Sequence, residues 1–133
     1  MTSARQSPRY REGTVTLQTT DRGEVTVPEP AWCTGHDDEY VGYLADVTHN
    51  GRLITATAAT AAHGPVEVAQ GYISHAPHAV RNPEPHPTLY IALDLHESFG
   101  PEDGRNVTRA LRVAAARFDL ALKDLARMRG EGQ

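Results

Sequence analysis

Cysteine and aromatic side chains are scarce in this sequence. Among 133 residues there is one cysteine and one tryptophan, and only 6% of the chain is aromatic. A single cysteine excludes an internal disulfide, and thin aromatic content limits the core. No apolar run approaches the roughly 18 residues of a membrane-spanning helix, and residues 1–6 lack the apolar segment of a signal peptide. We therefore expect a soluble cytoplasmic protein without a membrane anchor.

Short catalytic motifs are also missing. The glycines are dispersed and match neither a phosphate-binding loop nor a dinucleotide-binding turn. The sequence has no serine nucleophile elbow and no His-Glu-x-x-His helix. A net charge of -4 argues against a general nucleic-acid coat, although residues 101–133 carry seven Lys/Arg and five Asp/Glu. Enzyme classes with such motifs are disfavoured, no catalytic residue is assigned, and nucleic-acid binding is left to the basic end of the chain.

Alternation of apolar and polar residues predicts strands in the first three quarters of the chain. Val15 and Leu17, the turn at residues 21–23, and Val25 and Val27 form the pattern of a β-hairpin. Further strands are expected over the three ranges 53–60, 66–73 and 89–95. The last of these is the most apolar and is predicted to be the central strand.

A helix is predicted from about Asn106 to Gly130, because apolar residues recur there every three or four positions instead of every second position. Its predicted buried stripe consists of Val107, Leu111, Ala114, Phe118, Leu122 and Leu125. An amphipathic helix needs an apolar surface to cover, so we predict an α+β fold in which one antiparallel sheet of about five strands is covered by this helix. Residues 13–129 would form one domain, with disordered tails at 1–12 and 130–133.

The segment Pro-Ala-Trp-Cys-Thr-Gly-His, residues 30–36, contains the only cysteine. Cys33 and His36 flank a glycine that permits a bend, and His49 follows shortly afterwards. Thiolate and imidazole are ligands that Zn²⁺ prefers, so Cys33, His36 and His49 are predicted to bind Zn²⁺. The fourth ligand is not evident; the candidates are Asp37, Asp38, His63, His75, His78, His86 and His96.

Two other interpretations of Cys33 remain open. Cys33 could be a small buried residue beside Trp32, without any ligand. Alternatively, Cys33 could be a nucleophile with His36 or His49 as its base, although no known nucleophile signature surrounds it.

The pattern Pro30-x-Trp32-Cys33-x-x-His36, followed by His49-x-Gly51 and an Ala/Leu-rich helix, resembles a small actinobacterial domain family of unknown function. The resemblance covers residues 13–128, and its specific part is the cysteine, the two histidines and their neighbours. It strengthens the metal hypothesis for those three residues and implies no activity.

Two further clusters have a functional and an ordinary interpretation. His75, His78 and His86 lie in a proline-rich stretch, 75–88, and could form a second metal site or be exposed histidines of a loop. One side of the predicted helix collects basic residues, with Asp119 nearby, and would bind phosphate or an acidic partner, or simply be a solvated face. These basic residues are Arg105, Arg109, Arg112, Lys123 and Arg127.

The sequence thus predicts a zinc-binding regulatory or accessory module that acts through contacts with a protein partner, with the metal in a structural role. One alternative is a metal-dependent hydrolase in which water fills the fourth position and Asp37, Asp38 or Glu39 is the general base. Another is a nucleic-acid adaptor that uses the basic side of the helix. Homodimerisation through a sheet edge or the helix is also compatible with the sequence.

Overall fold

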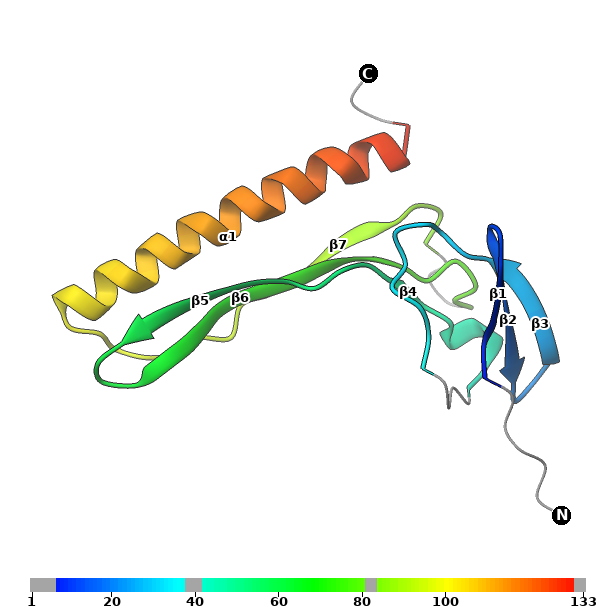
Figure 1. Ribbon diagram of the computed structural model, residues 1–133, viewed down its shortest axis with the longest axis horizontal. Helices are drawn as coiled ribbons and strands as arrows, with labels where there is room; N and C mark the ends of the chain where they lie inside the picture. The colour runs from blue at the N-terminus through cyan, green and yellow to red at the C-terminus, as the bar shows by residue number, and fades with distance from the viewer. Residues whose placement is uncertain (1–6, 38–41, 81–83, 131–133) are drawn as a thin grey trace, which may run out of the picture. The chain divides into compact units, whose positions relative to one another are not determined.

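The computed structural model describes residues 7–37, 42–80 and 84–130. In these ranges the chain forms two sheets, a short 3₁₀ helix and one long C-terminal α-helix (Figure 1). The elements are β1 (Arg9–Arg11), β2 (Thr14–Thr19), β3 (Gly23–Pro28), η1 (Leu44–Asp46), β4 (His49–Asn50), β5 (Ile54–Thr60), β6 (Gly64–His75), β7 (Thr88–Ala92) and α1 (Pro101–Met128). The α+β class is confirmed, but the strands are divided between two sheets.

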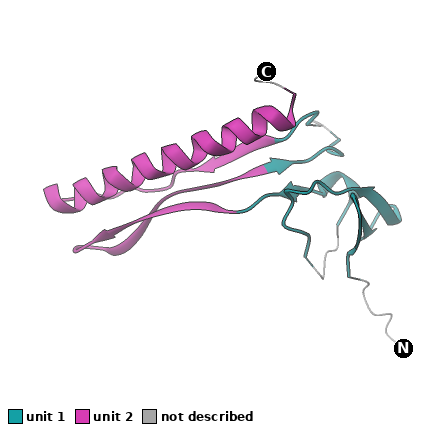
Figure 2. Cartoon of the chain, turned by 45° about the horizontal axis from the view of Figure 1, so that its top comes forward, with its two compact units in different colours: residues 1–52, 74–87 teal, residues 53–73, 88–133 magenta. Residues whose placement is uncertain are grey.

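The chain separates into two compact units, coloured in Figure 2. Unit 1 comprises residues 1–52 and 74–87, and unit 2 comprises residues 53–73 and 88–133. Each unit has its own cluster of buried apolar side chains. That both belong to one domain over residues 13–129 stays a prediction. Within the described residues, α1 is the one long helix, and it is not apolar enough to cross a bilayer.

Unit 1 contains the sheet β1-β2-β3, in which both strand pairs are antiparallel. The predicted hairpin is confirmed as β2 and β3, because alternate residues of β2 are buried. Val15, Leu17, Val27 and Val47 form its small core. The expected tail over residues 1–12 is wrong for Arg9–Arg11, since these residues pair with Thr14–Thr16 as β1. Residues 1–6 lie outside the described residues.

In the second sheet, β6 pairs with β4, β5 and β7. The prediction that residues 89–95 form the central strand is therefore wrong: β6 is central, and β7 ends at Ala92. Ile91 and Leu93 are 45% and 66% exposed, so high apolar content there does not reflect burial on both faces.

The same turn chemistry closes the β2–β3 and β5–β6 hairpins. Thr19 Oγ1 donates to Gly23 O at 2.8 Å, and Thr60 Oγ1 donates to Gly64 O at 2.6 Å. In each turn the residue before the glycine donates its N–H to the threonine hydroxyl. Gly23 and Gly64 have φ values of 63° and 67°, which only glycine adopts readily. A Thr-x-x-x-Gly sequence therefore defines both turns.

Helix α1 begins at Pro101, five residues before the predicted start at Asn106. Proline is well suited to a first turn because it has no N–H to satisfy there. Its buried stripe is Val107, Ala110, Ala114, Phe118, Ala121 and Leu125. Leu111 and Leu122, predicted to be buried, are 41% and 45% exposed.

The observed buried stripe of α1 is shifted from the predicted one because small side chains line the contact between α1 and the sheet of unit 2. Ala56 and Ala58 of β5 lie in the same buried cluster as Ala110 and Ala114. Small residues on both surfaces allow close approach and place the alanines, rather than the leucines, at the centre of the interface. The helical period and four of the six predicted stripe residues are confirmed, but the buried face is shifted from Leu111 and Leu122 toward Ala110 and Ala121.

Candidate metal centre

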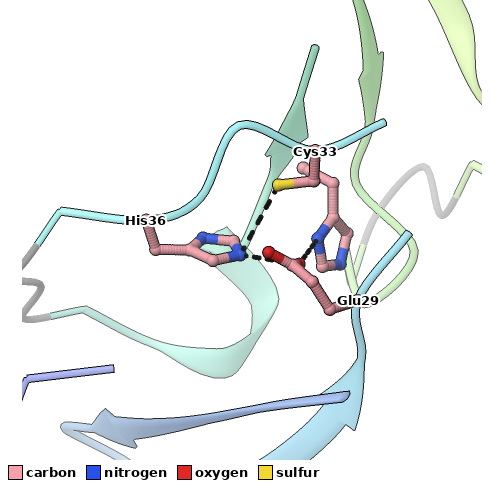
Figure 3. Close-up of side chains that lie close together, drawn as sticks. Glu29, Cys33 and His36 are labelled. Atoms are coloured by element: carbon pink, nitrogen blue, oxygen red, sulfur yellow. Dashed lines mark hydrogen bonds and ion pairs between the residues drawn. The ribbon is translucent and has the colours of Figure 1, made fainter. Parts of the chain in front are cut away.

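Four side chains of unit 1 converge on one point. Glu29, Cys33, His36 and His49 each offer one ligand atom, and these atoms lie within 4.8 Å of one another. Figure 3 shows the labelled side chains of Glu29, Cys33 and His36 pointing toward one another. The structure thus brings together all three residues predicted as ligands and adds Glu29 as a fourth.

Glu29 and His36 make most of the close contacts within the cluster. Glu29 Oε1 lies 3.0 Å from His36 Nε2 and 2.8 Å from His49 Nδ1. Cys33 Sγ lies 3.9 Å from the same His36 Nε2. The two imidazole rings meet edge to face, with centroids 5.2 Å apart. Sulfur, carboxylate and two ring nitrogens therefore face a common centre.

Backbone hydrogen bonds fix the segments that carry these ligands. Glu29, which follows β3, donates its N–H to Gly13 O at 2.9 Å. Thr34 donates both its N–H and its hydroxyl to Asn50 O, which holds the 33–36 bend against β4. Tyr10 Oη accepts the N–H of His36 at 2.8 Å. Strands from both sheets therefore determine where the ligands lie.

Gly35 makes the bend between Cys33 and His36 feasible. Its φ of 105° is strained for other residues, and its N–H donates to Cys33 Sγ at 3.4 Å. A Cβ at this position would lie 3.1 Å from Tyr10 Oη. The sequence argument for a permissive glycine at this position is thus confirmed by the backbone.

Burial determines the protonation of Cys33 and His49. Burial raises the pKa of the Cys33 thiol, while N–H bonds from Gly35 and Asn50 lower it and Glu29 raises it. Burial also lowers the pKa of His49, against the opposing effect of Glu29. At neutral pH His49 is then a neutral imidazole with a lone pair to offer, whereas a metal would displace the Cys33 proton. N–H bonds to sulfur stabilise the resulting thiolate.

The geometry does not match a cysteine nucleophile with His36 as its base. In such a triad the nucleophile uses one ring nitrogen of the histidine, and the orienting carboxylate uses the other. Here Cys33 Sγ and Glu29 Oε1 both approach Nε2 of His36. A raised pKa of Cys33 also disfavours the reactive thiolate. Mutual proximity of one potential ligand atom from each side chain is instead compatible with ligands around a common ion.

None of the described residues that the sequence offered as a fourth ligand belongs to the cluster. His75 Nε2 donates to Glu84 O at 2.7 Å, His63 lies 3.8 Å from Glu97, and His96 is 87% exposed. His78 is half-buried and His86 is exposed, so the second histidine site is not assembled among the described residues. Asp37 is exposed, and Asp38 and Glu39 lie outside the described residues.

The basic residues predicted on the polar side of the helix are exposed to solvent. All five are exposed, namely Arg105, Arg109, Arg112, Lys123 and Arg127. Arg127 forms an ion pair with Asp124, and Arg109 donates to Asn106 Oδ1 at 3.4 Å. Nucleic-acid binding by this side of α1 stays a prediction.

Glu29 is the functional residue that the sequence argument missed. The carboxylate lies between Pro28 and Pro30, a setting that indicates a connecting segment rather than a site. The available signal was its position four residues before Cys33, directly after a predicted strand.

Comparison with known proteins gives one result. No curated protein and no solved structure matches the chain. A family model described as a domain of unknown function, DUF6907, matches residues 14–127, which include all four residues of the cluster. The chain therefore belongs to the DUF6907 family, whose function is unknown.

Proposed function

We propose that Glu29, Cys33, His36 and His49 bind one Zn²⁺ in a structural site, and that the chain is a zinc-dependent accessory module acting through protein contacts. The observation that carries the proposal is the convergence of four ligand atoms within 4.8 Å. One thiolate, two imidazoles and one carboxylate are ligand types found around zinc. Thiolate and imidazole together favour zinc over the hard cations Mg²⁺ and Ca²⁺.

Distances within the cluster are close to those that a tetrahedral ion requires. Zn–N and Zn–O bonds of about 2.0 Å and Zn–S bonds of about 2.3 Å place ligand atoms about 3.2 to 3.6 Å apart. The observed separations of His36 Nε2 from Glu29 Oε1 and from Cys33 Sγ are 3.0 and 3.9 Å. Small side-chain adjustments would therefore admit the ion.

A fourth protein ligand supports a structural site over a hydrolytic one. Catalytic zinc sites leave one position for water, whereas structural sites are filled by the protein. The side chains of Glu29, His36 and His49 are 11%, 5% and 2% exposed, so three of the four ligands are largely shielded, although Glu29, Cys33 and His36 also line an open pocket of about 460 Å³. A single thiolate ligand also fits the reducing cytoplasm that the sequence predicts.

A bound ion would join three segments that the small core of unit 1 holds only weakly. Glu29 follows β3, Cys33 and His36 belong to the bend, and His49 begins β4. Zinc would then replace apolar packing as the main stabilising interaction of this region.

The test is metal analysis of the purified protein together with its Co²⁺ spectrum. We expect one zinc per chain in the wild type, and loss of metal in Cys33→Ser and Glu29→Gln. Co²⁺ should give a sulfur-to-metal charge-transfer band and tetrahedral d–d bands. His96→Ala and Glu24→Gln are the matched controls, because both residues lie outside the cluster, and they should retain the metal. A folded wild type that binds neither metal would overturn the proposal.

A further inference from the structure

Strand β5 in unit 2 has an open edge. It lies at the end of its sheet and pairs with β6 alone among the described strands. An unpaired edge presents backbone N–H and C=O groups that can pair with another strand, and proteins often cover such edges.

Helix α1 covers the two ends of this edge with side chains. Asn106 Nδ2 donates to Ala59 O at 3.1 Å, and Arg117 Nη1 donates to Thr55 O. Thr57 lies midway between these two residues. The register with β6 is unbroken from Thr57 to Ala59, and shifts between Ala56 and Thr57. Because alternate residues of a strand direct their backbone groups to the same side, the N–H and C=O of Thr57 point outward as Ala59 O does. The middle of the edge is therefore available for pairing between two capped positions.

A cavity of about 340 Å³ lies along this edge. Residues 56–59 of β5 form one wall, and α1 forms the other through residues that include Arg109, Val113 and Arg117. The alanines of β5 leave the space open because their side chains are small. Both arginines are exposed, and the residues that line the cavity, all of them described, include no Asp or Glu. The cavity thus combines strand-pairing groups with positive charge.

Charge decides which strand fits the edge. If β5 of a second copy paired in antiparallel fashion about Thr57, Thr55 of one copy would face Ala59 of the other. Arg117, held at Thr55, would then lie next to Arg109 and Asn106 of the second copy. Like charges at such close range disfavour self-pairing, whereas carboxylates on the added strand would neutralise them.

We propose that the open edge of β5 binds an extended acidic segment of a partner protein, which adds to the sheet as a strand. Backbone groups of the segment pair with Thr57, carboxylates bind Arg109 and Arg117, and an apolar side chain contacts Val113. Main-chain hydrogen bonds supply affinity and side chains supply selectivity in this mode of recognition. The inference concerns unit 2 and does not depend on the metal in unit 1.

The test uses the full-length ¹⁵N-labelled protein and a short synthetic peptide in which Glu alternates with Val. We expect the amide resonances of Thr57 and Ala59 to shift on titration, and binding to weaken with added salt. A peptide in which Lys alternates with Val should bind at least about tenfold more weakly.

Variants of the two arginines test the role of charge. Arg109→Gln and Arg117→Gln should each weaken binding of the Glu peptide about fivefold or more. Arg112→Gln is the matched control, since Arg112 is exposed on the same helix but does not line the cavity, and it should bind as the wild type does. Thr57→Pro removes an outward N–H without removing a bond to β6, so it should abolish binding.

Four results would overturn the proposal. They are equal binding of the Lys and Glu peptides, the same resonance shifts with inorganic phosphate at comparable affinity, self-association through β5 in sedimentation, and no shifts with the Glu peptide at millimolar concentration. The arginine variants keep the test informative if Thr57→Pro fails to fold.

Discussion

The two units are stabilised in different ways. Unit 1 has a core of four buried apolar residues and a polar cluster of four side chains that could hold a metal ion. Unit 2 has a cluster of eight buried apolar residues, four from the sheet and four from α1, and no such ligand cluster among its described residues. With the proposed zinc bound, the chain would divide its stabilisation between a metal and an apolar core, each acting on its own part of the fold.

Removal of the metal is the strongest way to separate the units. Chelation should abolish amide-exchange protection at Val15 and Leu17 of unit 1 while leaving protection at Ala56 and Val68 of unit 2. Structural zinc contributes on the order of 10 kcal/mol in small metal-dependent domains, more than the small core of unit 1 can supply. Hydrogen exchange read by mass spectrometry before and after chelation measures this. Equal loss in both units would show that they are not stabilised separately.

Truncation of a core residue of unit 2 should destabilise unit 2 and leave the metal site of unit 1 intact. Phe118→Ala removes a buried aromatic side chain of unit 2 and should lower the free energy of unfolding by about 3–5 kcal/mol. Leu120→Ala, at a position that is 63% exposed on the same helix, should cost less than about 0.5 kcal/mol. Denaturant unfolding measures both. Metal content should be unchanged in the two variants, and its loss in Phe118→Ala would contradict the separation.

A methyl group at Gly71 probes the close packing in unit 2. A Cβ there would lie 2.9 Å from Phe118 Cε1 and would also clash with Tyr90 O, so Gly71→Ala should cost about 1–3 kcal/mol. Gly104→Ala is the control, because its nearest neighbour is an ordinary contact at 3.8 Å. In α1 that change should stabilise by about 0.5–1 kcal/mol. Thermal unfolding of the two variants should therefore shift in opposite directions.

The smallest effect should come from Tyr10, which lies outside the cluster but fixes the bend. Tyr10→Phe removes the hydroxyl that accepts the N–H of His36, a bond worth about 0.5–1.5 kcal/mol. Metal should then be transferred to a competing chelator up to about tenfold more readily. Exchange protection in unit 2 should not change. Slower transfer than in the wild type would be inconsistent with a positioning role for Tyr10.

Residue type and local spacing were enough to predict part of the site. Cys33 and His36 carry their own signal because soft ligands flank a glycine bend, and His49 adds a second imidazole. Glu29 could not be predicted in the same way, because glutamate is common on surfaces and only the pairing of β3 with β2 places it beside His49. A ligand contributed by tertiary structure leaves little trace in local sequence.

A similar limit applies to the fold. The hairpin of β2 and β3 and the period of α1 follow from local patterns and were predicted. Four of the six residues predicted for the buried face of α1 are buried, but the face is shifted, because Ala110 packs in the same cluster as Ala56 and Ala58 while Leu111 remains exposed. The division into two sheets depends on long-range pairing, which alternation along one strand does not specify.

X-ray absorption spectroscopy at the zinc edge tests the central claim most directly. For the purified protein we predict one sulfur ligand at about 2.3 Å and three nitrogen or oxygen ligands at about 2.0 Å, from Cys33, His36, His49 and Glu29. Glu29→Gln should lose the metal. Zinc without a sulfur ligand, or no retained zinc in a folded protein, would contradict the account.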